Sequence, residues 1–284
     1  MKTGNVFPRP AGGGKRRKIY LFIVFPPEGR GDKEPQKVLK VRGARGMKEE
    51  IARLKELVEG SDNIVFFGGA GVSTESGIPD FRSVDGLYNQ KYKFPPETIL
   101  SHSFFEANPE EYYRFHHEKL TLGGAKPNAA HLRLAQLEAE GKLKAVITQN
   151  IDGLHQAAGS ETVLELHGSL LRAYCARCGK KWPAQTMNET DGVPRCDCGG
   201  VIRPDIVFYE EPLDQDIMYR AVKFIREADM LIIGGTSLVV YPAAGLIDYY
   251  RGHKLVLINR GQTPQDSYAD LIIRDSIGEV FSQI

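Results

Sequence analysis

The sequence NIVFFGGAGVS, at residues 63–73, decides the fold. Its apolar first half predicts a buried strand, and its glycines predict a tight loop directly after that strand. Similar apolar runs recur at 144–148, 230–233 and 254–258, with shorter ones at 162–166 and 271–273. Helical patterns lie between them, at 129–140, 216–227 and 243–250. Apolar strands that alternate with helices predict an α/β fold with a Rossmann-like, doubly wound parallel sheet.

Two stretches interrupt this alternation and predict a smaller second lobe. The first is a helical insertion at about 80–124, which is rich in aromatic residues and proline. The second is a zinc-binding insertion at about 170–204, which contains every cysteine of the chain. An amphipathic helix is expected to begin at Met47. We therefore expect one catalytic domain over 47–284 and a basic flexible extension over 1–46.

Composition and charge restrict the classes of function. The chain has 284 residues, of which 42% are hydrophobic, enough for one sizeable core with a smaller satellite. No apolar run approaches the roughly 20 residues of a membrane span. The net charge of +1 conceals 12 Lys/Arg against 3 Asp/Glu in residues 1–46, and an acidic body. The body therefore has no general attraction to nucleic acid.

The basic extension has three interpretations. Lys15–Lys18 precedes the apolar run Ile19–Phe25, as in a secretion signal. That run is short, Pro26 and Pro27 follow it, and no small-residue cleavage site is present, so a cytoplasmic location is expected. A nucleic-acid-binding arm and a plain flexible tail remain as alternatives.

The four cysteines are spaced as a metal site. Cys175 and Cys178 form a CxxC pair, and Cys196 and Cys198 form a CxC pair after 17 further residues. Paired thiolates on two tight turns can bind one tetrahedral Zn²⁺, and four sulfur ligands leave no open position for catalysis. One structural zinc ion is therefore expected. A thioredoxin-like redox role is the alternative, but no matching fold pattern adjoins the cysteines.

The glycine loop at 69–73 is typical of a phosphate-binding turn. Its glycines would let backbone N–H groups approach a diphosphate, and a following helix N-terminus would add a favourable dipole. Thr74 stands where the dinucleotide fingerprint has its third small residue, so an ordinary dehydrogenase is disfavoured. A tight strand–helix turn without a ligand is the alternative.

A polar cluster, TQNIDGLH at 148–155, follows the strand at 144–148. Doubly wound folds bind ligands at this end of their strands, and amide and carboxylate groups suit hydroxyl and carboxamide recognition. An Asx-type turn is the alternative. His167 follows the short run at 162–166 and is a candidate general base, although composition cannot choose it among seven histidines.

Taken together, these motifs resemble the sirtuins, the NAD-dependent protein-lysine deacylases. The matching blocks are the cysteine cluster, GAGVSTESGIPDFRS (69–83), TQNIDGLH (148–155), LHG (166–168), RPDIVFYEE (203–211), GTSLVVYPAA (235–244) and LIN (257–259). They follow the family's order over roughly residues 47–284, and their combination is highly specific.

The resemblance implies a role for each matching residue. His167 is the expected base, with Asn150 beside it in catalysis, and Val207 and Phe208 would pair with an extended acyl-lysine peptide. The expected NAD contacts are Gly69, Ala70, Gly71, Ser73, Ile78, Asp80, Phe81, Arg82, Gln149, Asn150, Ile151, Asp152, Gly235, Thr236, Ser237, Asn259 and Arg260.

The implied reaction transfers the acyl group of lysine to ADP-ribose. Nicotinamide leaves, the acyl oxygen captures the ribose carbon, and His167 deprotonates a ribose hydroxyl that attacks the acyl carbon. Gly68 replaces the family's usual Thr, and Glu210 replaces its usual Gly. The stretch His116–Lys119 lacks the Tyr-x-x-Arg pair of members that take acidic acyl groups, which favours neutral groups, acetyl first.

Three other functions compete with this interpretation. An ADP-ribosyltransferase or NAD glycohydrolase would use the same pocket and release nicotinamide without acyl-lysine. A deacylase with a preference for another acyl group is also open. A non-enzymatic zinc-ribbon module would not need His167.

Overall fold

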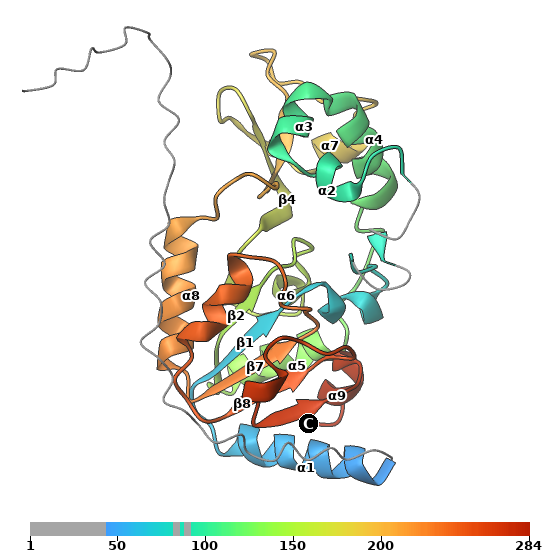
Figure 1. Ribbon diagram of the computed structural model, residues 1–284. Helices are drawn as coiled ribbons and strands as arrows, with labels where there is room; N and C mark the ends of the chain where they lie inside the picture. Colours follow the sequence, from blue (N-terminus) through green and yellow to red (C-terminus); the bar gives the residue numbers. More distant parts are fainter. Residues whose placement is uncertain (1–43, 82–85, 88–91) are drawn as a thin grey trace, which may run out of the picture. The chain divides into compact units, whose positions relative to one another are not determined.

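The computed structural model describes residues 44–81, 86–87 and 92–284 and contains a six-stranded parallel sheet (Figure 1). The strand order is β3-β2-β1-β7-β8-β9. The strands are β1 (Ile64–Gly68), β2 (Leu143–Thr148), β3 (Val163–Glu165), β7 (Met230–Gly234), β8 (Leu255–Ile258) and β9 (Leu271–Ile273). This arrangement confirms the predicted doubly wound α/β fold.

Helices cover the sheet on both faces because successive strand residues point to opposite sides. Phe66 packs in one core and Phe67 in the other, and both are fully buried. The first core is covered by α1 (Ala44–Glu59), α5 (Ala129–Ala139) and α9 (Ile277–Phe281). The second is covered by α8 (Gln215–Glu227) and the 3₁₀ helix η4 (Ala243–Tyr249).

Two helices differ from their predicted form. Helix α1 begins at Ala44, three residues before Met47, so the helical pattern extends further than its apolar residues indicate. The helix expected at 243–250 is a 3₁₀ helix that ends at Tyr249. Residues 1–43 of the predicted basic extension lie outside the described residues. Among those described, no helix is long and apolar enough to cross a membrane.

The order of the strands reverses between β1 and β7. The chain builds the sheet outward from β1 to β3, then returns to place β7 directly beside β1, with Gly68 opposite Gly234. The loops after β1 and β7 therefore leave the sheet in diverging directions. Such a reversal opens a crevice at the carboxyl ends of the strands, where doubly wound proteins bind ligands.

A second, antiparallel sheet and a group of helices form a smaller lobe. The sheet has the order β5-β4-β6, with strands β4 (Gly168–Cys175), β5 (Lys181–Pro183) and β6 (Ile202–Ile206). Its helices are α2 (Pro96–Ile99), α3 (His102–Ala107), α4 (Pro109–Lys119) and α7 (Gln185–Glu189). The two insertions share one core, in which Tyr112 and Tyr113 are fully buried. The predicted boundaries at about 80–124 and 170–204 remain a proposal.

Two buried histidines lie in contact with each other. The rings of His131, in α5, and His155, in α6 (Leu154–Ala157), have centroids 4.7 Å apart. Neither ring nitrogen of His155 has a hydrogen-bond partner within the described part of the chain. Burial lowers the pKa of His131 to about 4 and that of His155 to about 3. Both rings are therefore neutral in the folded protein at neutral pH.

This pair predicts that acid destabilises the fold. Below pH 6.5 the unfolded chain protonates both histidines while the folded chain does not, so the free energy of unfolding falls as pH falls towards 4. Substituting His155→Phe removes one of these groups and keeps a ring beside Phe66. Urea unfolding of both proteins, each at the same zinc concentration, gives the free energy of unfolding at each pH. The slope of this free energy against pH should be smaller in the variant by up to about 1.4 kcal/mol per pH unit. An equal slope in the two proteins would show that His155 does not cause the acid sensitivity.

Candidate functional site

One cavity of about 850 Å³ gathers the predicted site residues at the carboxyl ends of the parallel strands. The residues predicted to contact NAD that line it are Gly69, Ala70, Gly71, Ser73, Ile78, Asp80, Phe81, Gln149, Asn150, Ile151, Asp152, Gly235, Thr236, Ser237, Asn259 and Arg260. His167, Val207 and Phe208 line it too. Arg82 lies outside the described residues. Motifs up to about 190 residues apart in sequence thus share one cavity.

The glycines of the first loop allow it to touch the loop after β7. The Gly71 N–H donates to the Gly235 carbonyl at 2.8 Å. A Cβ at Gly71 would lie 2.8 Å from Gly235 Cα, and one at Gly235 would lie 2.4 Å from Val72 N. Gly235 also has a φ of +58°, in the left-handed region. These glycines are therefore required for loop packing, independently of any ligand.

The loop does not enter a long helix. Two single-turn 3₁₀ helices follow it instead, η1 (Ala70–Val72) and η2 (Thr74–Ser76). The expectation of a helix N-terminus with its dipole is wrong here, because turns this short align few peptide groups. The glycines do provide close approach of one backbone to another, as the Gly71–Gly235 contact shows.

Ser73 joins the first loop to the polar cluster after β2. Its hydroxyl donates to Asp152 Oδ2 at 2.7 Å and accepts from Asn150 Nδ2 at 3.0 Å. Asp152 also accepts the Leu154 N–H through Oδ1 at 2.9 Å. All three polar side chains are buried. The network fixes the orientation of the Asn150 amide, since its nitrogen must face the serine.

His167 is held in one tautomer by the backbone. Its Nδ1 lies 2.9 Å from the Gln149 carbonyl oxygen. Because a carbonyl only accepts, Nδ1 carries the proton and Nε2 keeps a lone pair. Burial lowers the pKa of His167, and the bond to Gln149 partly offsets this. The ring is therefore a neutral base with Nε2 available.

The backbone of His167 meets the segment that follows β6. The His167 carbonyl accepts the Val207 N–H at 3.0 Å. At the next position, Gly168 has a φ of +76°, and a Cβ there would lie 2.0 Å from the Asp205 carbonyl oxygen. The glycine thus lets β4 start directly against β6. The candidate base is connected to Gln149 on one side and to Val207 on the other.

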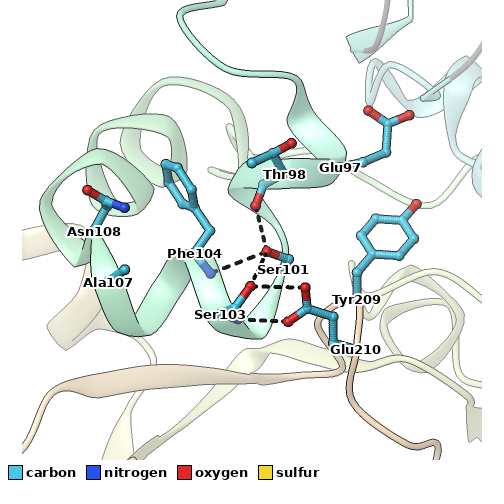
Figure 2. A pocket seen from close by; sticks show the side chains of 9 residues that line it. All are labelled: Glu97, Thr98, Ser101, Ser103, Phe104, Ala107, Asn108, Tyr209 and Glu210. Carbon is cyan, nitrogen blue, oxygen red and sulfur yellow. Dashed lines mark hydrogen bonds between the residues drawn. The ribbon is translucent and has the colours of Figure 1, made fainter.

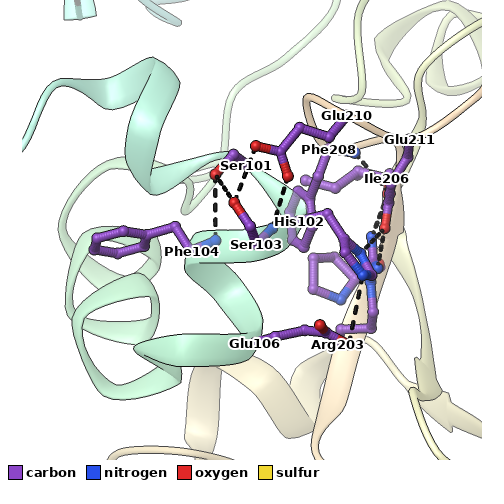
Figure 3. Close-up of polar contacts among 11 residues, drawn as sticks. Ser101, His102, Ser103, Phe104, Glu106, Arg203, Ile206, Phe208, Glu210 and Glu211 are labelled. Atoms are coloured by element: carbon purple, nitrogen blue, oxygen red, sulfur yellow. Dashed lines mark hydrogen bonds and ion pairs between the residues drawn. The ribbon is translucent and has the colours of Figure 1, made fainter. Parts of the chain in front are cut away.

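An ion pair between the buried Arg203 and the partly buried Glu211 supports this segment, and the sequence motifs had assigned no role to it (Figure 3). Glu211 accepts from Arg203 Nη1 at 2.5 Å and Nη2 at 2.9 Å, and from the Phe208 N–H at 2.8 Å. The Arg203 guanidinium lies 4.1 Å from the Phe208 ring centroid. Burial alone would raise the pKa of Glu211, but these donors hold it below its usual value. Both residues stand in the RPDIVFYEE block, which was the available sequence signal.

The cavity also has an apolar wall that no motif indicated. Leu120 and Leu122, which follow α4, line it together with Leu100 and Leu87. Of the stretch His116–Lys119, only Lys119 lines the cavity. His116 and His117 instead contact Asn188 and the Met187 carbonyl of α7, at 3.0 and 2.8 Å. Scattered leucines carry no spacing signal, so only the folded chain reveals this wall.

The four cysteines converge as predicted. Their sulfur atoms all lie within 4.8 Å of one another, with Cys175 to Cys198 at 3.5 Å and Cys178 to Cys196 at 3.7 Å. Thiolates bound to one tetrahedral Zn²⁺ at about 2.3 Å lie about 3.8 Å apart. Gly200 has no room for a Cβ, which would lie 2.7 Å from Cys175 Sγ. The cluster is consistent with a structural zinc site.

This architecture places the chain in the class of doubly wound α/β proteins that bind a nucleotide where the strand order reverses. The chain belongs to the Sir2 family, whose model matches residues 69–242. An NAD-dependent protein deacetylase of Clostridium perfringens is 59% identical over 242 residues, which cover 84% of this chain and 99% of that protein. One of Cutibacterium acnes is 50% identical, with coverages of 82% and 96%.

Solved Sir2 structures match this chain over most of its length. A Sir2 structure with a p53 peptide and NAD⁺ has a TM-score of 0.74 and 44% identity, covering 82% of this chain and 96% of that one. A Sir2 complex with an inhibitor, 2′-O-acetyl-ADP-ribose and a deacetylated p53 peptide has a TM-score of 0.73 and 42% identity, with the same coverages.

The contact between the two loops predicts an effect on stability without any ligand. Gly71→Ala should lower the free energy of unfolding by about 1–3 kcal/mol, because the added methyl group overpacks against Gly235. Gly261→Ala is the control, since its Cβ would meet nothing closer than Asn259 Nδ2 at 3.9 Å. Urea unfolding of both variants in the absence of NAD measures the difference. Equal stabilities would show that the loops can move apart.

Proposed function

We propose that this chain, an NAD-dependent protein deacetylase, transfers the acetyl group of an acetyl-lysine protein or peptide to ADP-ribose, with His167 as its base. The observation that carries this proposal is the pair of contacts made by His167. Its ring is oriented by Gln149 of the predicted NAD region, and its carbonyl binds Val207 of the predicted peptide region. A base connected to both regions suits a reaction between two substrates.

NAD would occupy the crevice between the loops after β1, β2, β7 and β8. When bound, it supplies a ribose carbon whose bond to nicotinamide breaks. The close loop contact at Gly71 and Gly235 leaves backbone, and no side-chain bulk, facing a diphosphate. The Ser73–Asp152–Asn150 network would present a fixed amide and carboxylate to the nicotinamide half. Asn259 and Arg260, after β8, would contact the adenosine half.

The acetylated peptide would bind along Val207 and Phe208. Both N–H groups already have acceptors, the His167 carbonyl and the Glu211 carboxylate. Carbonyl oxygens have two lone pairs, so pairing through the carbonyls of this segment would leave those bonds intact. Strand addition of this kind recognises the backbone of the peptide more than its side chains.

His167 would act through Nε2. With Nδ1–H bound to Gln149, proton transfer from a ribose hydroxyl to Nε2 gives an imidazolium whose other N–H still faces a carbonyl. Because burial lowers the pKa of this histidine, the neutral form persists below pH 6.5. The enzyme would keep its base in the active form across neutral pH.

The lining of the cavity supports a neutral acyl group, acetyl first. The leucine wall is apolar, and the single cation contributed by the end of α4 is Lys119, which lies over the ring of Tyr92 at 5.7 Å. An acyl carboxylate would have to draw Lys119 away from that ring. A cytoplasmic location and the partition into a 1–46 extension and a 47–284 catalytic domain stay predictions from the sequence.

The decisive experiment is mass spectrometry of the products from purified protein, NAD and an acetyl-lysine peptide. Nicotinamide and O-acetyl-ADP-ribose should form only when the peptide is present. ADP-ribose or ADP-ribosylated protein, formed regardless of peptide, would assign the chain to the glycohydrolases or transferases instead. Succinyl-lysine peptide, offered in parallel, tests the acyl preference.

His167→Ala should lower kcat by at least about a hundredfold, because a general base contributes that much or more. NAD affinity, measured by calorimetry, should change little. In the unaltered enzyme, kcat/KM should fall on the acid side only below pH 6.5, as the lowered pKa requires. The exposed His253→Ala is the control and should keep full activity. Loss of NAD binding in His167→Ala would indicate a structural histidine.

Cys196→Ala should lose zinc and the fold of the smaller lobe together, because three thiolates bind the ion far more weakly than four. Atomic absorption gives the metal content, and thermal unfolding gives the stability. Asp197→Ala is the matched control, since this exposed neighbour has no thiolate and pairs with Lys180. A Cys196→Ala protein that keeps full activity without zinc would refute the structural role.

A further inference from the structure

Glu210 has a backbone conformation that a side chain normally avoids. Its φ is +76°, and only Glu210 and Leu238 among the described non-glycine residues have a positive φ. In this region the Cβ atom crowds the backbone, so glycine is the favoured residue. The sirtuin pattern usually has glycine at this position. A glutamate persists here only if its surroundings compensate for the strain.

The carboxylate of Glu210 makes that compensation by binding the start of helix α3 (Figure 2). Oε2 accepts the Ser103 N–H at 2.9 Å, and Oε1 accepts the Ser103 hydroxyl at 2.9 Å. The first N–H groups of a helix have no partner within the helix. Both oxygens thus bond to one residue of the helical insertion, more than 100 positions away in sequence.

Neighbouring residues bind the same turn. The Tyr209 N–H donates to the Leu100 carbonyl at 2.9 Å, and the Tyr209 carbonyl accepts the His102 N–H at 3.0 Å. Glu211 contacts His102 Nδ1 at 2.8 Å (Figure 3). The segment 207–211 is thus attached to the start of α3 at three successive residues, Tyr209, Glu210 and Glu211.

The middle of the segment also borders open space. Tyr209 and Glu210 line the large cavity, and they also line a second cavity of about 550 Å³ bordered by Glu97, Ser103 and Asn108. Residues 209 and 210 thus border both cavities, and the hydrogen bonds to the start of α3 contribute to their position.

We propose that Glu210 is a positioning residue for the peptide substrate. Its carboxylate fixes the segment 207–211 to α3 and so holds the Val207–Phe208 backbone ready for strand pairing. The inference rests on the proposed function, in which that backbone binds the acetylated peptide. Preorganisation of this kind raises peptide affinity without taking part in the chemistry.

The test is the dissociation constant of a fluorescein-labelled acetyl-lysine peptide, measured by anisotropy without NAD on the full chain. Glu210→Gly removes the tether and also relieves the left-handed strain, so the fold should survive. We expect peptide binding about five- to tenfold weaker, NAD affinity within about twofold, and a raised peptide KM with little change in kcat.

Two variants separate position from charge. Glu210→Gln keeps an acceptor for the Ser103 N–H without the charge and should bind the peptide nearly as well as the unaltered protein. Glu97→Gln removes an exposed charge from the same small cavity and should have no effect. Ser103→Ala should weaken peptide binding less than Glu210→Gly, and adding it to Glu210→Gly should change nothing further.

Unchanged peptide affinity in Glu210→Gly would overturn the inference, as would a loss in Glu210→Gln equal to that in Glu210→Gly. The latter result would mean that the carboxylate acts by its charge. If the unaltered protein itself does not bind the acetylated peptide, the proposed function fails and the inference fails with it. If the unaltered protein binds the peptide and Glu210→Gly binds it equally well, the inference is refuted and the proposed function stands.

Discussion

The close contact between the loops after β1 and β7 is the constraint on which the site depends. Both strands are buried apolar runs that end in paired glycines, Gly68 opposite Gly234. Beyond them, Gly71 and Gly235 touch through their backbones, with no room for a Cβ on either side. The loops after β1 and β7 therefore stay together as far as Gly71 and Gly235 and separate beyond these residues. The crevice at the reversal of strand order, and the cavity that extends from it, begin at these glycines.

His167 extends this rigid region into the smaller lobe. Its ring takes its orientation from Gln149, which follows β2 and whose side chain donates to Thr236 after β7 at 3.2 Å. Its carbonyl holds Val207, and Gly168 lets β4 begin directly against β6. A shift of the smaller lobe relative to the sheet would thus disturb His167, the proposed base, and the proposed peptide segment together.

The sequence predicts what is local and misses what is long-range. Short-range patterns in the sequence predict three features. Apolar runs predict the parallel strands, the spacing of the thiols predicts the cysteine cluster, and groups of glycine and polar residues mark the loops after β1, β2 and β7. The leucine wall has no such pattern, because Leu87, Leu100 and the two leucines after α4 come together only in the folded chain. The Glu211–Arg203 pair lies within one motif block, eight residues apart, but the block does not reveal that the two side chains bond to each other. The expected helix after the glycine loop failed for a related reason. Packing against Gly235 imposes short 3₁₀ turns that no local propensity reveals.

Glu210 departs from the family pattern, and its side chain adds a contact that glycine cannot make. The backbone bonds of Tyr209 to Leu100 and His102, and the bonds of Glu211 to Arg203, flank residue 210, which has a φ of +76°. Glycine accepts that conformation without strain but contributes no contact of its own. Glutamate is strained in that conformation, but its carboxylate accepts two hydrogen bonds from Ser103. The two residues therefore differ in the contacts that they can make with the start of α3.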